Sequence, residues 1–449
     1  MTIDSVLLAA GHGTRMRSKL HKVLHPLAGQ PMIWHSLQAL KAAGSQDPVV
    51  VVGHQAEAVR QAIGSEVQFA LQEEQLGTGH AVQQAEGMLR GKGDLVLVTF
   101  ADMPLVTGET LQKLIDRQKS NDGPFTMLTV IAQDPRGFGR VLRNADGHVM
   151  AIVEHAHATA EQLEIRELNA SAYCFEADWL WDNLANISLS PKGEYYLTDL
   201  VEIAVKQGST VAAVVLDDAN EAIGINTRVH LAEAEAALRR RINNEWMLAG
   251  VTLMDPSTTY IEAGVRIGGD TVIYPNSSLQ GETQIGAECS IGPNTMVRSS
   301  QIGDRCKVFA SVVENAKLEN DVDIGPYGHL RKGAHLADGV HMGNFGEVKN
   351  AYLGPGTKAG HFSYIGDATI GKNVNIGAGT ITCNFDGEKK NHTEIEDDVF
   401  IGSDTMLVAP LKIEKGARSG AGSVITKNVP ADTVVAGIPA RAIRKLTKE

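Results

Sequence analysis

The stretch "IGGDTVIYPNSSLQGETQIGAECSIGPNTMV", residues 267–297, decides the fold of the second half of the chain. Every sixth residue from Ile267 to Val297 is apolar, and glycine follows several of these positions. A period of six predicts a parallel β-helix, in which each hexad forms one short flat face and a turn. Glycine lets the backbone turn the corner without a clash at Cβ. We therefore expect the apolar residues to point inward and three faces to close a coil of about eighteen residues.

The same period returns twice further along the chain. It runs from Ile324 through Val348 to Ile365, and it restarts from Ile395 to Ile425. One apolar residue before a glycine carries no information, whereas a period repeated over these lengths is a strong signal, and it predicts roughly nine stacked coils. Loops that leave such a solenoid usually build its binding face, so the break at "CNFDGEKKNHTE" (residues 383–394) marks a candidate site.

The composition argues against several classes of protein. The net charge of −12 disfavours sequence-independent binding of nucleic acid, which needs a basic surface. The run "SVLLAA" near the start is too short for a signal-peptide core, and no run approaches the ~20 apolar residues of a membrane span. The four cysteines are scattered without metal-site spacing, which predicts reduced thiols in a cytoplasmic protein.

The first half of the chain alternates short apolar runs with helical patterns, which is typical of an α/β domain with a mostly parallel sheet. Ligands of such sheets collect beyond the carboxyl ends of the strands. The runs expected to form strands are Val6–Ala10, Val49–Val52, Val67–Leu71, Leu95–Phe100, Thr126–Ile131 and Val211–Leu216.

The loop after the first of these strands has the composition of a phosphate site. In "GHGTRMRSKLHK" (residues 11–22), Gly11 and Gly13 let backbone amides approach an anion, and Arg15 and Lys22 supply two charges. A lone pair of glycines is structural about as often as functional. Their place directly after an apolar strand, with two cations close behind, favours phosphate binding.

Residues 227–249 have the pattern of one long helix, with an apolar stripe that includes Leu231, Leu238 and Trp246. The three arginines at 239–241 point in different directions on a helix, so they indicate a solvated face rather than a nucleic-acid site. We expect an α/β domain at 1–228, a linker helix at 229–249 and a solenoid domain at 250–449.

The solenoid period also predicts which residues stack. Arg331 and Lys349 are eighteen residues apart, and each follows an inward residue of an unbroken comb. Two cations would then lie one above the other at the strand spacing of about 4.8 Å. Like charges so close are unfavourable unless both splay into water or an anion bridges them, and we favour an anion site for a sugar phosphate. His361 and Tyr364 are expected on a different face, so a site shared between subunits is inferred.

Three further motifs narrow the function. The chain contains "LAAGHGTRM" (8–16) followed by a lysine, "QLGTGHA" (75–81) and "EYYLTDL" (194–200). Together with the solenoid they resemble the family of bifunctional N-acetylglucosamine-1-phosphate uridylyltransferases/glucosamine-1-phosphate acetyltransferases, over essentially the whole chain. The resemblance implies an α/β nucleotidyltransferase domain joined by a long helix to a left-handed parallel β-helix that forms a homotrimer.

The resemblance also implies the reactions of UDP-N-acetylglucosamine synthesis. Glucosamine 1-phosphate is acetylated by acetyl-CoA, and N-acetylglucosamine 1-phosphate then takes UMP from UTP with release of pyrophosphate, assisted by Mg²⁺. The partners would be these small molecules, with neither nucleic acid nor membrane. The alternatives are a single-function sugar-1-phosphate nucleotidylyltransferase whose β-helix only oligomerises, and a non-enzymatic scaffold, which the phosphate loop disfavours.

For the uridylyl site, the resemblance points to Leu8, Ala9, Ala10, Gly11, Arg15, Lys22, Gln72, Gly77, Thr78, Phe100, Ala101, Asp102, Gly139, Glu154, Asn169 and Asn226. Asp102 and Asn226 would hold Mg²⁺, since one carboxylate and one amide suit an ion that keeps waters and substrate oxygens. The Gln72 amide, with a donor and an acceptor, could pair with the imide edge of uracil. Phe100-Ala101 and Ala170-Ser171 stand where the family usually has Tyr-Gly and Thr-Gly, which leaves the sugar selectivity open.

For the acetyl site, the resemblance makes His361 the base that deprotonates the attacking amine, with Glu347 as a candidate to orient its ring. Arg441 and Arg444 are candidates for the phosphates of the coenzyme. The substrate contacts would be Arg331, Lys349, Tyr364 and Asn375, and the acetyl-CoA contacts Ala378, Asn384, Phe385, Ser403 and Ala421.

Overall fold

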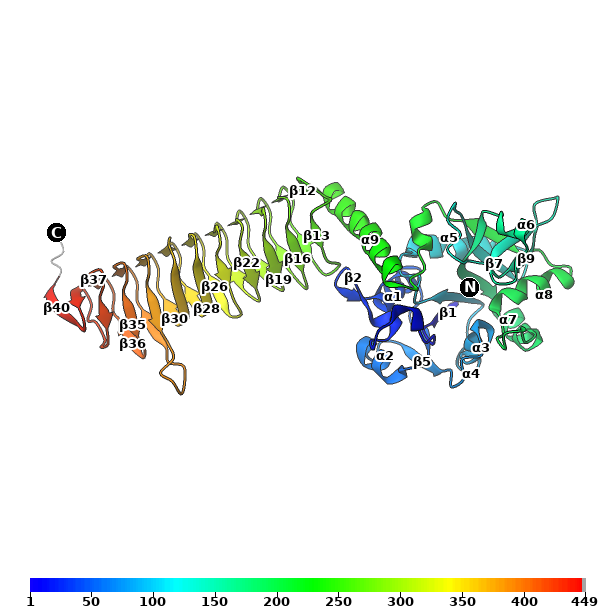
Figure 1. The fold of residues 1–449 in the computed structure, drawn as a ribbon, viewed down its shortest axis with the longest axis horizontal. Coiled ribbons are helices and arrows are strands. Elements are labelled where there is room, and N and C mark those ends of the chain that lie inside the picture. The colour runs from blue at the N-terminus through cyan, green and yellow to red at the C-terminus, as the bar shows by residue number, and fades with distance from the viewer. Residues whose placement is uncertain (446–449) are drawn as a thin grey trace. The chain divides into compact units, whose positions relative to one another are not determined.

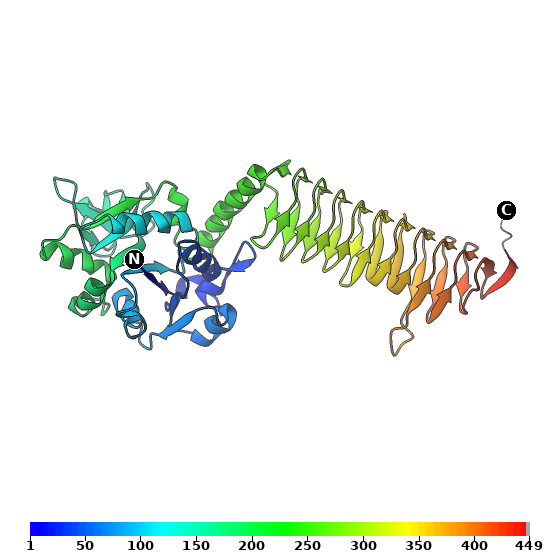
Figure 2. The same ribbon diagram turned by 180° about the vertical axis from the view of Figure 1, so that it is seen from behind.

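The computed structural model describes residues 1–445, and the chain divides into two compact units between Leu238 and Arg239. Figures 1 and 2 show an α/β unit in blue to green and a solenoid in green to red. The helix α9 (Arg228–Leu248) runs across the division, so the predicted helix is present. The domain boundaries given above remain a prediction.

The first unit is built on one central sheet with the strand order β11-β7-β10-β6-β1-β4-β5. Its strands match the six predicted runs closely, and a hairpin of β8 (Arg140–Arg143) and β9 (Val149–Val153) joins the edge of β10. The strands of the main path are β1 (Ile3–Leu8), β4 (Val49–Val52), β5 (Gln68–Leu71), β6 (Leu95–Phe100), β7 (Phe125–Ile131), β10 (Glu167–Glu176) and β11 (Ala212–Val215).

The long strand β10 was not predicted, and along the main path of the sheet it is the strand that departs from the parallel arrangement. It runs antiparallel to both β6 and β7, with a bulge between Asn169 and Tyr173. Its sequence "ELNASAYCFE" mixes small, polar and apolar residues, so no short apolar run marks it. The bulge begins at Asn169, one of the residues predicted for the uridylyl site.

Alternate residues of the strands enter two separate cores, because successive side chains of a strand point to opposite faces. Val6 and Leu8 pack with one group of helices, whereas Leu7 and Ala9 pack with another. The helices of this unit, α9 apart, are α1 (Met32–Ala42), α2 (Ala56–Ile63), α3 (Thr78–Gln83), α4 (Glu86–Leu89), α5 (Gly108–Lys119), α6 (Ala160–Leu163), α7 (Ala177–Asn183) and α8 (Leu200–Lys206). The sheet is thus buried on both faces, and its open positions are at the strand ends.

The second unit is a parallel β-helix, as predicted. Short strands pair in register from coil to coil in a 12-stranded and a 17-stranded sheet. The predicted inward residues are buried throughout, from Ile267 at 8% exposed to Ile425 at 2%. The strands that carry the site are β25 (His329–Leu330), β28 (Gly346–Leu353), β30 (Ser363–Ile370), β31 (Asn375–Ile376) and β32 (Ile381–Cys383).

The coils vary in length, which explains why the period seemed to stop after Val297. Ile285 pairs with Ile302 and Ile302 with Leu318, so these coils contain 17 and 16 residues. The solenoid therefore continues where the six-residue comb is lost. The coil from Val348 to Ile365 also has 17 residues, and this matters for the site.

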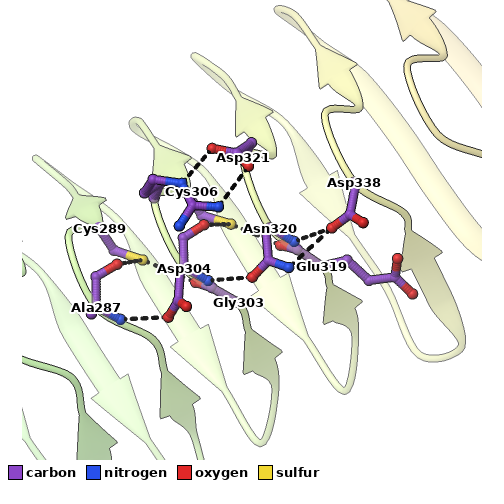
Figure 3. A network of polar contacts seen from close by, with 10 residues as sticks. Ala287, Cys289, Gly303, Asp304, Cys306, Glu319, Asn320, Asp321 and Asp338 are labelled. Atoms are coloured by element: carbon purple, nitrogen blue, oxygen red, sulfur yellow. Dashed lines mark hydrogen bonds and ion pairs between the residues drawn. The ribbon is translucent and has the colours of Figure 1, made fainter.

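Polar contacts along the turns lock neighbouring coils together (Figure 3). Asp304, Asn320 and Asp338 each accept a hydrogen bond from a backbone amide of the preceding coil, at 2.8 to 2.9 Å. The thiols of Cys289 and Cys306 each donate to a carbonyl of the following coil at 3.0 Å. Such contacts oppose sliding of one coil against the next, so they keep the register that brings distant residues together.

The four cysteines are free thiols. Among residues 1–445, no helix combines the length and the apolar character that crossing a membrane requires.

Candidate active sites

The carboxyl ends of β1, β5 and β6 open into a cavity of about 630 Å³. Of the residues predicted for the uridylyl site, Ala101 is fully buried behind the wall and Gly139 lies outside the lining, where a Cβ would meet Ile152. The remaining ones form the wall: Leu8, Ala9, Ala10, Gly11, Arg15, Lys22, Gln72, Gly77, Thr78, Phe100, Asp102, Glu154, Asn169 and Asn226.

The phosphate loop is folded so that its two cations face the cavity. Arg15 lies in the turn Thr14–Met16 and Lys22 begins the turn Lys22–Leu24. Gly13 has φ +62°, and a Cβ there would lie only 2.5 Å from Cβ of Lys22. Only glycine therefore lets the chain that carries Lys22 pack against the loop.

Asp102 and Asn226 direct their oxygens at one point, although they are far apart in the sequence. Lys22 Nζ donates to Asp102 Oδ2 at 2.5 Å and to Asn226 Oδ1 at 2.8 Å. Arg15 donates to the same Asn226 oxygen at 2.9 Å. One carboxylate and one amide oxygen thus converge on a single cation, here the lysine ammonium. Hard oxygen donors in this arrangement fit Mg²⁺.

The two sequence motifs around Gln72 and Tyr195 form one wall of the cavity. Tyr195 N donates to Leu76 O, and Leu197 N donates to the hydroxyl of Thr78 at 2.9 Å. Gln72 is buried, and its amide nitrogen donates to the carbonyl of Gly77 and contacts His80 Nδ1, both at 3.1 Å. With the amide nitrogen turned toward Gly77 and His80, the side-chain oxygen of Gln72 is the atom that can accept from a base.

Two acids with raised pKa values lie at or beside the cavity, Glu154 in its lining and Asp199 next to the lining residue Thr198. Burial raises the pKa of Glu154, which accepts a hydrogen bond from Thr198. Burial, helped by Glu202 and Glu154, raises the pKa of Asp199 to about 6. Tyr173, Glu194 and Tyr196 also line the cavity and were not predicted, although Glu194 and Tyr196 belong to the quoted motif "EYYLTDL".

Three histidines gather beside the phosphate loop. The rings of His12 and His54 are 5.1 Å apart, and those of His21 and His54 are 6.3 Å apart. His21 is 3% exposed, and burial together with His54 lowers its pKa to about 4, an effect that the nearby Gly11 backbone offsets only in part. His21 is therefore neutral near pH 7.

In the solenoid, the register confirms the predicted cation stack. Leu330 pairs with Val348, so Arg331 lies above Lys349. Arg331 forms an ion pair with Glu347 at 2.7 Å, so within the chain Glu347 binds Arg331 rather than orienting His361.

The expectation that Tyr364 lies on another face was wrong. Tyr364 pairs with Glu347 and Gly366 with Lys349, because Ile365 is the third inward residue after Val348 and so lies one full coil further on. Tyr364 therefore shares a face with Arg331 and Lys349.

The loop that leaves the solenoid folds back onto this face. Asn384 Nδ2 lies 3.4 Å from the Tyr364 hydroxyl. Lys390, a residue that was not predicted, lies next to Lys349, and together with Arg331 it lowers the pKa of the Lys349 ammonium. Three cations, a tyrosine and an amide thus gather at one place, which could hold a phosphorylated sugar.

His361 lies on a neighbouring turn with the residues predicted to bind acetyl-CoA. Gly379 N donates to the carbonyl of Phe362, the residue after His361, and Asp404 N donates to that of Ala378. Gly422 N donates to the carbonyl of Ser403, which brings Ala421 to the same edge.

The other predicted residues of this site lie elsewhere. Asn375 belongs to β31 in the other sheet, and Phe385 is 61% exposed at the base of the loop. Arg441 and Arg444 are exposed on β40 (Ala440–Lys445).

Comparison with known proteins agrees with this division of the chain. Residues 5–172 match the model of the MobA-like NTP transferase domain. Residues 264–299 match the bacterial transferase hexapeptide, and residues 393–427 the hexapeptide repeat of succinyl-transferase. The bifunctional protein GlmU of Exiguobacterium sibiricum is 47% identical over 95% of each chain, and that of Heliobacterium modesticaldum is 49% identical over 95% of this chain and 93% of its own. The chain belongs to the GlmU family.

The family membership confirms the resemblance seen in the sequence. The chain is a bifunctional enzyme with uridylyltransferase and glucosamine-1-phosphate acetyltransferase activities, and its substrates are nucleotides, acetyl-CoA and sugar phosphates. A GlmU protein of Pelobacter propionicus, 48% identical over 96% of this chain, matches the solenoid as well as the α/β unit, which disfavours a β-helix that only oligomerises.

Proposed function

We propose that the cavity of the α/β unit transfers UMP from UTP to N-acetylglucosamine 1-phosphate with Arg15, Lys22, Asp102 and Asn226 as its central residues. The observation that carries this proposal is the convergence of the Asp102 and Asn226 oxygens on one cation. Mg²⁺ bound there would neutralise the charge that develops on the phosphates. Arg15 and Lys22 add cationic donors, and little proton transfer is required, so catalysis rests on positioning and electrostatics.

The rest of the cavity would select the substrates. The free carbonyl oxygen of Gln72 can accept from the imide N–H of uracil, while Gly77 and Thr78 hold the wall behind it. Glu154 and Asn169 would contact the sugar and ribose hydroxyls, with Gly139 keeping the space beside Glu154 open. A binding test without catalysis is titration with Mn²⁺ followed by water-proton relaxation. Asp102→Asn should weaken Mn²⁺ binding, and unchanged binding would remove Asp102 from the metal site.

For the solenoid, we propose that Arg331, Lys349 and Lys390 bind the phosphate of glucosamine 1-phosphate beside Tyr364. Asn384, predicted above as an acetyl-CoA contact, lies against Tyr364, and we place it at the sugar phosphate instead. The close approach of three cations supports an anion at this place, since like charges repel unless an anion lies between them. His361 would take the proton of the attacking amine, because imidazole titrates near neutrality. Ala378, Ser403 and Ala421 would hold acetyl-CoA along the turn, with Phe385, Arg441 and Arg444 as outer contacts, and Asn375 would contact the sugar phosphate.

We further propose a homotrimer, in which the turn of His361 from one chain completes the cation site of its neighbour. The support is that His361 lies on a turn, whereas Arg331, Lys349 and Tyr364 lie on an adjoining face, so the two groups do not share one cavity. A cytoplasmic location is proposed on the four free thiols. The activities are measured by supplying glucosamine 1-phosphate, acetyl-CoA, UTP and Mg²⁺, and following free CoA and pyrophosphate separately. Absence of either product would overturn the corresponding half.

A further inference from the structure

Asp367 occupies a corner of the solenoid next to the proposed acetyl-transfer site, and no role was predicted for it. It interrupts β30 with φ +49°, and its side chain is only 13% exposed. One coil earlier the equivalent corner is Asn350, with φ +46°. Asparagine and aspartate are both ordinary at such left-handed positions, as Asp321 and Asp398 also show. A carboxylate that is largely buried there calls for partners.

The partners of Asp367 are two side-chain amides, each bound to a different oxygen. Asn350 Nδ2 donates to Oδ1 at 2.6 Å, and Asn384 Nδ2 donates to Oδ2 at 2.5 Å. Burial alone would raise the pKa of Asp367, but these hydrogen bonds and the charges of Lys390 and Lys349 together hold the pKa below its usual range. The group is therefore an anion near pH 7, and an anionic carboxylate can only accept hydrogen bonds.

This fixes the orientation of the Asn384 amide. Because the carboxylate accepts only, the NH₂ group of Asn384 must face it, and the carbonyl oxygen Oδ1 must point another way. The same Nδ2 lies 3.4 Å from the hydroxyl of Tyr364. The amide oxygen is thus left as an acceptor for a ligand.

The backbone at Gly366, beneath Tyr364 and Asn384, leaves no room for a side chain. Gly366 lies above Lys349, and a Cβ on it would collide with the Tyr364 hydroxyl and come within 2.8 Å of Asn384 Nδ2. The hydroxyl and the amide therefore meet over bare backbone at one face of the cation cluster. Asp367 also lies 3.9 Å from Lys390 Nζ, so it offsets part of the repulsion between Lys390 and Lys349.

We propose that Asp367 is a positioning residue for acetyl transfer, which holds Asn384 with its amide oxygen toward the attacking amine and holds Lys390 beside Lys349. The inference rests on the proposed assignment of Asn384 to that site. An amine attacks through its lone pair, so an acceptor that takes one of its N–H hydrogens leaves the lone pair free. A flipped amide would instead donate to the lone pair and compete with the reaction.

The main test is Asp367→Asn, which keeps the shape and the left-handed backbone but lets the Asn384 amide adopt either orientation. We expect kcat for acetyl transfer to fall by roughly 10-fold to 100-fold, the usual cost of losing a residue that orients a functional group. The KM for acetyl-CoA should stay unchanged. The matched control is Asn350→Gly, which removes the equally short hydrogen bond to the other oxygen and should change kcat by less than about threefold.

Exchanging the residues at positions 367 and 384 tests the orientation of the amide directly. If Asp367 only stabilised the fold, the exchange would not restore kcat. Asn384→Asp alone places two carboxylates against each other. Adding Asp367→Asn restores one donor and one acceptor, and leaves an acceptor oxygen at position 384 for the amine. We expect the double variant to exceed Asn384→Asp in kcat by roughly fivefold or more, the coupling typical of residues in contact. Pyrophosphate release by the α/β unit, measured on the same samples, reports on intact protein.

The outcomes separate this inference from the site assignment beneath it. If Asn384→Ala leaves acetyl transfer unchanged, the assignment of Asn384 fails. If Asn384→Ala lowers kcat while Asp367→Asn does not, the positioning role alone is overturned. Failure of the swap to improve on Asn384→Asp, or a loss in Asn350→Gly equal to that in Asp367→Asn, would likewise contradict the orientation argument.

Discussion

The two sites of this chain are assembled in different ways. In the α/β unit, Arg15 contacts Asn226, a residue 211 positions away, because strand ends that are distant in the sequence meet at one edge of the sheet. In the solenoid, the contacts of the site join residues of adjacent coils, such as Arg331 and Glu347, 16 positions apart. A sheet of this kind gathers a site in one cavity, whereas a solenoid spreads its groups over faces and turns. The first site can therefore be complete in one chain, and the second invites a neighbour.

The largest effect should come from removing the proposed base of the solenoid site. We expect His361→Ala to slow acetyl transfer by roughly 10²-fold to 10⁴-fold, the usual contribution of a general base. Uridylyl transfer should be unaffected, because its residues belong to the other unit. Release of CoA and of pyrophosphate, measured separately, checks both statements. Loss of the two activities together would indicate a defect in folding rather than in chemistry.

The reciprocal change in the α/β unit should have a somewhat smaller effect. Asp102→Asn removes one charge from the pair of oxygens that converge on Lys22, and we expect uridylyl transfer to fall by roughly 10²-fold to 10³-fold. Raising the Mg²⁺ concentration should restore part of the rate if the change acts through metal binding. Acetyl transfer serves as the internal control. A loss that no Mg²⁺ concentration relieves would contradict the proposed metal role.

Mixed assemblies test the contrast between the sites directly. A His361→Ala chain and a Lys349→Ala chain are unfolded together and refolded as a mixture. If each acetyl site takes His361 from one chain and Lys349 from the next, random trimers should recover about a quarter of the normal activity. The same mixture of Lys22→Ala and Asp102→Ala chains should recover no uridylyl activity, because one chain supplies both residues. If the two mixtures recovered the same fraction of their activities, the proposed contrast between a site within one chain and a site shared by two chains would be wrong.

The same contrast explains what the sequence could predict. The phosphate loop was predictable from its residues alone, since a glycine pair directly after an apolar strand is followed there by two cations. Asn226 followed only from the family resemblance, because no local pattern marks it. In the solenoid, the six-residue period predicted the Arg331–Lys349 stack. Tyr364 was misplaced because the faces were not counted through the shortened step between Val348 and Leu353, after which Ile365 returns to the face of Val348. The roles of Asp367 and Lys390 were missed because they depend on how the loop at 383–394 folds. The loop folds back onto the solenoid and brings Asn384 and Lys390 next to Asp367, which no sequence spacing predicts.

The smallest predicted effect concerns the stability of the α/β unit, whose phosphate loop packs against a buried histidine. The solenoid site offers no counterpart among the residues discussed above. His21 is neutral and buried beside the phosphate loop, with a pKa lowered from 6.5 to about 4. The unfolded chain binds a proton there below about pH 6.5, whereas the folded chain does so only near pH 4. Its contribution is thus complete above pH 6.5 and is lost as the pH falls, by about 2 kcal/mol between pH 7.5 and pH 5.

Replacement of His21 should remove this loss. The backbone at His21 has φ −57°, which proline adopts readily. Relative to the parent, His21→Pro should gain about 2 kcal/mol in unfolding free energy on going from pH 7.5 to pH 5. Urea unfolding at the two pH values, followed by tryptophan fluorescence, measures it. The comparison with the parent is needed because Asp199, with its pKa raised to about 6, gains stability on acidification and masks the loss. Asp199→Asn should therefore show the opposite sign, and no variant of the exposed His54 should match His21→Pro.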